Sequence, residues 1–180
     1  LVTVKPPNTN VHQHAPHANA DCVFVVDTSF SMNEAAGEVQ ELHGVRFNVL
    51  DIAKHALQTI CYSMAASTRI AVVSFSDTAT IECGLTYCTQ EGKEHIVHSV
   101  MKMKPLRATN LIAGIAAAFE VAAEARPHCV CNIVILTDGM PTAQYHPARA
   151  VPGRLSESYS AFVRKLQSNC PSCPIITSVG

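Results

Sequence analysis

The feature that most constrains the fold of this chain is an alternation of short, continuous apolar runs with segments of helical periodicity. Cys22–Val26, Ile70–Phe75 and Val130–Thr137 are apolar at most positions, which is typical of strands buried on both faces of a sheet. Between them, Val45–Ala66 and Asn110–Ala125 repeat apolar residues at the spacing of an amphipathic helix. Strands that alternate with helices predict an α/β fold on a mostly parallel sheet.

One edge of this predicted sheet is antiparallel. Only Ser76 and Asp77 separate the strand at Ile70–Phe75 from a further strand at Thr78–Cys83, and so short a link favours a hairpin. The whole pattern predicts a doubly wound sheet. Its remaining elements are expected as helices at Glu91–Met101 and Leu155–Leu166 and a strand at Ile175–Val179.

Composition and charge narrow the classes of function. The chain has 180 residues, of which 48% are hydrophobic and 15% charged, as in a single globular domain. A formal net charge of −1 with scattered Lys and Arg indicates neither nucleic-acid nor membrane-surface binding. No apolar run is long enough to cross a bilayer. Residues 1–20 lack periodicity and are predicted to be a linker or flexible tail, followed by a domain at 21–180.

The chain has eight cysteines, and several of them lie inside apolar runs, where buried free thiols are expected. The sequence contains no Asn-x-Ser/Thr glycosylation site, which favours an intracellular setting with reduced thiols. Two further interpretations of the cysteines near the chain's end are disfavoured, because Cys129 and Cys131 flank the start of a predicted strand, where neighbouring side chains face opposite ways. They are a zinc site drawn from His128, Cys129, Cys131, Cys170 and Cys173, and a redox pair at Cys170 and Cys173.

Three polar clusters follow predicted elements at positions where an α/β sheet holds its ligands. The first is Asp27-Thr28-Ser29-Phe30-Ser31, directly after the first strand. The second is Thr109-Asn110, at the start of an Ala-rich helix, and the third is Asp138-Gly139, at the end of the strand after that helix. Each cluster alone is more simply explained as a helix cap or a turn. Their coincidence at three ligand-facing ends favours one shared site.

The candidate ligands of this site are all oxygens. Two carboxylates and three hydroxyls suit a hard cation such as Mg²⁺ or Mn²⁺. If the neutral hydroxyls make most of the direct bonds, the ion keeps excess positive charge and attracts a further anionic ligand. The predicted metal ligands are Asp27, Ser29, Ser31, Thr109 and Asp138.

With these motifs in place, the chain resembles a von Willebrand factor type A domain from about Asp21 to Gly180. The family's metal-ion-dependent adhesion site reads D-x-S-x-S, then a distant Thr, then a distant Asp followed by Gly. All five ligand positions are filled here, and the strings Ile70-Ala-Val-Val-Ser-Phe-Ser76 and Ile135-Leu-Thr-Asp-Gly139 strengthen the resemblance. It implies that the first strand lies beside the strand ending at Asp138. It also implies a further helix and strand, so that this domain is expected to be truncated at its C-terminus.

The resemblance further implies that Ser29 and Ser31 bind the ion directly, that Thr109 does so in some states, and that both aspartates act directly or through water. Family members bind protein partners, often through an acidic partner residue. We therefore expect a binding module without turnover, whose protein ligand offers an Asp or Glu carboxylate. The alternatives are a metal-assisted hydrolase and a structural domain with an unoccupied site inside a larger protein, by analogy a ubiquitin ligase.

Two departures from the family pattern border the predicted site. Phe30 occupies a position where Gly is common, so its ring either contacts a partner or folds back onto the domain. Arg107-Ala108 replaces a small, often Gly-rich approach to Thr109. The Arg107 cation could attract the partner's acid or discourage the metal.

Overall fold

The computed structural model describes residues 20–36, 47–139, 141–147 and 159–179. Five strands form one sheet in the order β3-β2-β1-β4-β5, in which only the β2–β3 pair is antiparallel. This arrangement confirms the predicted α/β fold with one antiparallel edge. The strands are β1 (Ala20–Asp27), β2 (Arg69–Phe75), β3 (Ala79–Tyr87), β4 (Val130–Leu136) and β5 (Ile175–Val179).

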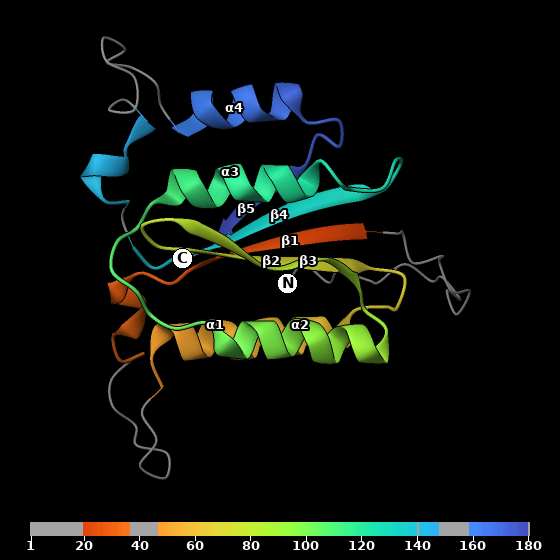
Figure 1. Ribbon diagram of the computed structural model, residues 1–180, viewed down its shortest axis with the longest axis horizontal. Coiled ribbons are helices and arrows are strands. Elements are labelled where there is room, and N and C mark those ends of the chain that lie inside the picture. The colour runs from red at the N-terminus through yellow and green to blue at the C-terminus, as the bar shows by residue number, and fades with distance from the viewer. Residues whose placement is uncertain (1–19, 37–46, 140, 148–158, 180) are drawn as a thin grey trace, which may run out of the picture.

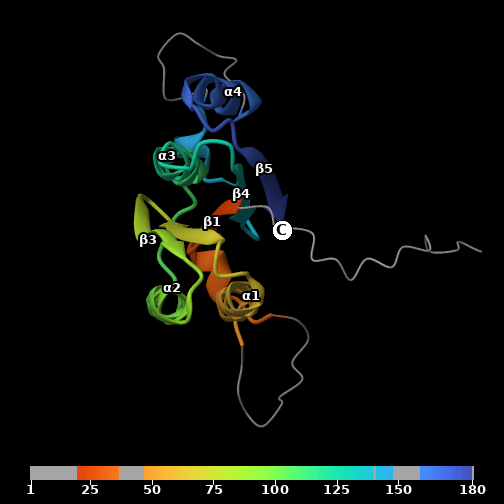
Figure 2. The ribbon, with the colours of Figure 1, turned by 90° about the vertical axis from the view of Figure 1, so that its right-hand side faces the viewer.

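Helices cover both faces of the sheet (Figure 1). One face carries α1 (Val49–Ser63) and α2 (Gln90–Lys102), and the other carries α3 (Leu111–Ala122) and α4 (Tyr159–Asn169), as Figure 2 shows end-on. Two short 3₁₀ helices, η1 (Phe30–Asn33) and η2 (Ala143–Tyr145), lie in loops. In the described part of the chain, every helix falls short of the length and apolar character needed to span a membrane.

The central strand β1 explains why the sheet has two cores. Successive side chains of a strand point to opposite faces, so a continuously apolar strand serves both layers. Phe24 and Val26 belong to the core beneath α1 and α2, whereas Val23 and Val25 belong to the core that includes α3. The cysteines of the apolar runs are buried as predicted, Cys22 and Cys61 in the first core and Cys131 in the second. Cys83, Cys88 and Cys170 are buried as well.

Several element boundaries differ from the sequence-based expectation. Strand β3 continues to Tyr87, four residues past its predicted end, because most positions of this sheet-edge strand are exposed or half-buried and its sequence is not uniformly apolar. Helix α1 begins at Val49, where Asn48 and Asp51 form a capping box. The predicted starts of two helices, 45–46 and 155–158, and the predicted linker up to residue 19 lie outside the described residues.

The order of the strands brings the three polar clusters together at the carboxyl ends of the parallel strands. Strand β1 lies between β2 and β4, with Asp27 paired to Phe75 and Val26 paired to Leu136. The loops that follow β1 and β4 therefore leave the sheet side by side. Asn110 fixes the start of α3 at the same edge: its N–H donates to the Ser76 carbonyl at 2.7 Å, and its side chain caps the helix.

Candidate metal site at the carboxyl edge of the sheet

Four of the five predicted ligands form a connected chain of oxygen contacts. The Oγ atoms of Ser29 and Ser31 lie 3.1 Å apart, and Ser31 Oγ donates a hydrogen bond to Asp138 Oδ1 at 2.9 Å. The Ser29 N–H donates to Asp27 Oδ1 at 2.7 Å. The expectation that Ser29 and Ser31 turn their hydroxyls the same way is confirmed.

Thr109 is the fifth predicted ligand, and its side chain forms no hydrogen bond with the other four. It borders a small space beside Gly139, which we call the hollow. A Cβ atom placed on Gly139 would lie 3.2 Å from Ser31 Oγ and 4.0 Å from Thr109 Oγ1. The absence of a side chain at Gly139 therefore leaves a small space that both hydroxyls border. Thr142 holds the Thr109 backbone there, since the Thr109 N–H donates to Thr142 Oγ1 at 3.1 Å and the Thr142 N–H donates to the Thr109 carbonyl at 3.0 Å.

Asp27 lies at the end of β1 and is fully buried. Thr137 Oγ1 donates to its Oδ2 at 2.5 Å, so both carboxylate oxygens already accept a hydrogen bond. Burial raises the pKa of Asp27, and the neighbouring negative charge of Asp138 adds to this; the hydrogen bonds from Thr137 and Ser29 oppose the shift without cancelling it. Among the described residues, Asp27 forms no ion pair with a basic side chain.

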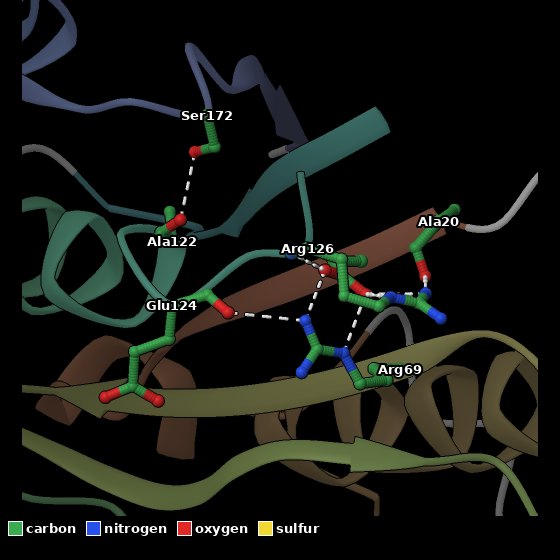
Figure 3. Close-up of polar contacts among 7 residues, drawn as sticks. Ala20, Arg69, Ala122, Glu124, Arg126 and Ser172 are labelled. Carbon is green, nitrogen blue, oxygen red and sulfur yellow. Dashed lines mark hydrogen bonds and ion pairs between the residues drawn. The ribbon is translucent and has the colours of Figure 1, made fainter. Parts of the chain in front are cut away.

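A second buried carboxylate, at the opposite end of β1, provides the contrast. Asp21 is also fully buried, but the guanidinium groups of Arg69 and Arg126 contact it at 2.6 and 2.8 Å (Figure 3). Burial raises the pKa of Asp21, yet the hydrogen bonds from the two arginines outweigh burial and lower the pKa below its usual value. One buried aspartate of β1 thus has two cationic partners, whereas Asp27 has none in the described part of the chain.

The residues present fit a hard divalent cation. Hydroxyl and carboxylate oxygens gather at one surface hollow, and a cation there would offset the charge of the buried Asp27. The described residues include no group of three or more His, Cys, Asp and Glu side chains that could hold a metal. That finding argues against the zinc alternative. It does not test the candidate site, which contains only two such residues and takes its other ligands from Ser and Thr. All eight cysteines are free thiols, and Cys173 is the exposed one.

The structure excludes one of the two alternatives left open for Phe30. Phe30 does not fold back onto the domain: 66% of its surface is exposed. The cause is local, since Ser29 and Ser31 point into the site and the side chain between them points away. Backbone bonds fix the loop, with the Thr28 N–H donating to the Phe75 carbonyl at 2.9 Å and the Leu106 N–H donating to the Thr28 carbonyl at 2.5 Å.

Sequence reasoning missed two residues that shape the site. Thr137 binds the buried carboxylate of Asp27, and Thr142 holds the backbone of Thr109. The only available signal for Thr137 was its place before Asp138 at a strand end. The resemblance implies that β1 and β4 are neighbours, as observed, but the contact of the Thr137 hydroxyl with Asp27 follows from side-chain geometry that no sequence pattern gives.

Comparison with known proteins supports the family resemblance. The sequence profile of the von Willebrand factor type A domain matches residues 22–140. Comparison with curated protein sequences finds no match.

Several solved structures share the fold. The PilB minor pilin of Streptococcus sanguinis is 19% identical with a TM-score of 0.64, over 91% of this chain and 50% of that one. Proximal thread matrix protein 1 of the mussel byssus is 22% identical with a TM-score of 0.62, over 91% of this chain and 36% of that one. The von Willebrand factor domain of the pilus tip protein Mfa5 of Porphyromonas gingivalis is 18% identical with a TM-score of 0.54, over 69% and 39%.

The chain spans half or less of the length of these three proteins, and at such identities the likeness concerns the fold alone. The profile match, in contrast, covers most of the chain and includes Asp27, Ser29, Ser31, Thr109 and Asp138. This chain belongs to the von Willebrand factor type A domain family.

Proposed function

We propose that this domain binds another protein through a divalent cation, Mg²⁺ or Mn²⁺, whose coordination is completed by an Asp or Glu carboxylate of the partner. The observation that carries the proposal is the buried carboxylate of Asp27, which has no cationic partner among the described residues, while Asp21 on the same strand has two. Burying an uncompensated charge is costly, so the fold tolerates Asp27 more readily when a cation is bound nearby.

The neutral and the charged residues of the site would have different roles in binding the cation. Ser29, Ser31 and Thr109 would offer neutral hydroxyl oxygens, and Asp138 would offer its exposed carboxylate. Asp27, with both oxygens engaged by Ser29 and Thr137, would hold the loop and contribute charge at a distance. Few direct anionic ligands leave the ion strongly attractive to an outside carboxylate, which is the chemistry that the ion supplies.

The proposal includes no turnover. A hydrolase would need a base free to activate water, and the buried carboxylate of the site is already hydrogen bonded twice. We expect no magnesium-dependent hydrolysis of a generic phosphoester. Hydrolysis that is lost in Asp27→Ala would instead favour the metal-assisted hydrolase.

Calorimetric titration of Mg²⁺ and Mn²⁺ tests the metal site. We expect saturable one-to-one binding to the wild-type chain and at least tenfold weaker binding to a Ser29→Ala, Asp138→Ala double variant, because the variant loses two of the proposed ligands. A matched double variant, Ser168→Ala with Glu120→Ala, removes an exposed hydroxyl and an exposed carboxylate on α4 and α3 and should bind like the wild type.

Thermal melts confirm that both double variants are folded before affinities are compared. Equal metal binding by the wild type and the site variant would reject the assignment of these ligands. Absence of binding in every protein would favour the structural domain with an unoccupied site.

A further inference from the structure

The loops that carry the candidate ligands also carry an apolar and cationic border on their solvent side. The Phe30 N–H donates to the Arg107 carbonyl at 3.4 Å, and the Leu106 N–H donates to the Thr28 carbonyl at 2.5 Å. These two bonds join the loop after β1 to the segment before α3. Phe30, Leu106 and Arg107 therefore lie together, within three residues of Ser29, Ser31 and Thr109. We call Phe30, Leu106 and Arg107 the site border.

In these loops polar side chains are buried and large apolar side chains are exposed, the opposite of the usual arrangement in a water-soluble domain. The polar residues Thr28, Ser29 and Thr109 are buried, whereas Phe30 and Leu106 are 66% and 54% exposed. Phe30 has the largest exposed fraction among the large hydrophobic residues in the described part of the chain. Ser29 and Ser31 turn toward the candidate site and leave the side chain of the residue between them outward, but nothing in this geometry requires that side chain to be large and apolar. Two such side chains beside one polar hollow are more typical of an interface than of free surface.

Charge on the same border is positive. Arg107 is exposed, and it makes no ion pair with any described residue. Lys102 at the end of α2 and Lys104 in the connection to α3 are also exposed, and this connection contains no acidic residue. A partner segment that brings a carboxylate to the hollow would meet favourable charge, and a segment with Lys or Arg beside that carboxylate would meet repulsion.

We propose that the site border selects a particular class of protein segment: one whose acidic residue is directly flanked by a large apolar residue and lacks neighbouring basic residues. The carboxylate enters the hollow, the apolar neighbour contacts Phe30 and Leu106, and Arg107 adds long-range attraction. This inference rests on the proposed metal-dependent function and identifies the partner chemistry that the site accepts.

Selection from a phage-displayed library of random linear peptides tests the proposal, with capture on the 180-residue chain in Mg²⁺ and release by chelator. We expect the released peptides to share an Asp or Glu next to Phe, Leu, Ile, Met or Trp, with Lys and Arg depleted around it. A synthetic peptide from the enriched set should bind Phe30→Ala or Leu106→Ala about tenfold more weakly, as truncation of an interface anchor does. Mg²⁺ affinity should remain unchanged in both variants.

Matched variants separate the border from general surface effects. Val130→Ala removes an exposed apolar side chain at the opposite end of the sheet and should bind the peptide like the wild type. Arg107→Gln should weaken the peptide more at low salt than at high salt, whereas Arg164→Gln on α4 should not.

Each failure has a distinct meaning. Peptides that carry an acid with no apolar neighbour, or that bind Phe30→Ala and Leu106→Ala as tightly as the wild type, would overturn this inference and leave the metal-dependent function standing. The absence of any chelator-released peptide would reject both.

Discussion

At the scale of single residues, Gly139 leaves space at the candidate site for the oxygens of Ser31 and Thr109. An added methyl group would lie 3.2 Å from Ser31 Oγ, closer than most Cβ contacts, so the hydroxyl must move. We expect Gly139→Ala to lower Mg²⁺ affinity by about tenfold or more, in the range seen when groups that orient metal ligands are disturbed. Calorimetry measures the change, and Gly84→Ala, where no atom lies within 4 Å, serves as the control. Equal affinities in the two variants would contradict this account of the space.

Much of the candidate site was predictable at this scale, because its geometry follows from local rules. The spacing of Ser29 and Ser31 in the D-x-S-x-S motif indicated that their hydroxyls lie together, as observed, although Ser31 belongs to the 3₁₀ helix η1 and not to an extended loop. Strand ends in an α/β sheet share one edge, which brings Asp138 to Ser31. The role of Thr137 was not predicted. The resemblance placed the two strands side by side, but whether the Thr137 hydroxyl turns toward Asp27 depends on the side-chain geometry at the strand ends.

At the scale of elements, the start of α2 is closely packed on the end of β3. A Cβ on Gly92 would lie 1.9 Å from the Tyr87 carbonyl oxygen, which is backbone and has little freedom to move. We expect Gly92→Ala to reduce the free energy of unfolding by about 1–3 kcal/mol, since the clash exceeds the ~1 kcal/mol that Ala gains over Gly within a helix.

Thermal and urea unfolding measure this loss, with Gly84→Ala again as the control that meets open space. Tyr87, at the end of β3, pairs with Arg69 at the start of β2, and the candidate site lies at the other end of the parallel strands. Mg²⁺ affinity below the melting temperature should therefore be unchanged. A Gly92→Ala variant as stable as the wild type would show that the Tyr87 backbone shifts at little cost.

The bounds of an element were predicted more accurately from the sequence when the element is buried on both faces. The central strands β1 and β4 are apolar in nearly continuous runs and were predicted within two residues of their observed bounds. The edge strand β3 was predicted too short, because its second half is exposed or half-buried, mixes polar with apolar residues and begins with Gly84. Helix α1 was predicted to start too early, because apolar spacing continues before the Asn48 cap that begins the helix.

At the scale of the whole molecule, the ion pairs of Asp21 tie β1, β2 and the loop after α3 together at the end of the strands opposite the candidate site. Arg69 and Arg126 hold the pKa of Asp21 below 3.8, despite burial, so the unfolded chain takes up the proton first as pH falls. The stability that these ion pairs contribute is therefore present above about pH 4 and is lost as pH falls further.

We expect Asp21→Asn to lower the free energy of unfolding at pH 7 by on the order of 3 kcal/mol, because both arginines lose their anion in a largely buried setting. The difference from the wild type should shrink as pH drops through the pKa of Asp21, and urea denaturation at several pH values measures it. A difference in the free energy of unfolding that stays constant with pH would show that the substitution destabilises the protein by altering packing and not by removing the charge of Asp21.

The exposed thiol of Cys173 has a practical consequence for handling the protein. Of the eight cysteines it is the only exposed one, and it precedes β5, at the end of the sheet away from Ser29, Ser31 and Asp138. Brief maleimide treatment at neutral pH should therefore attach a fluorophore or a biosensor surface mainly there. Molecules tethered in this way would present the candidate site outward, in one orientation, to whatever flows past.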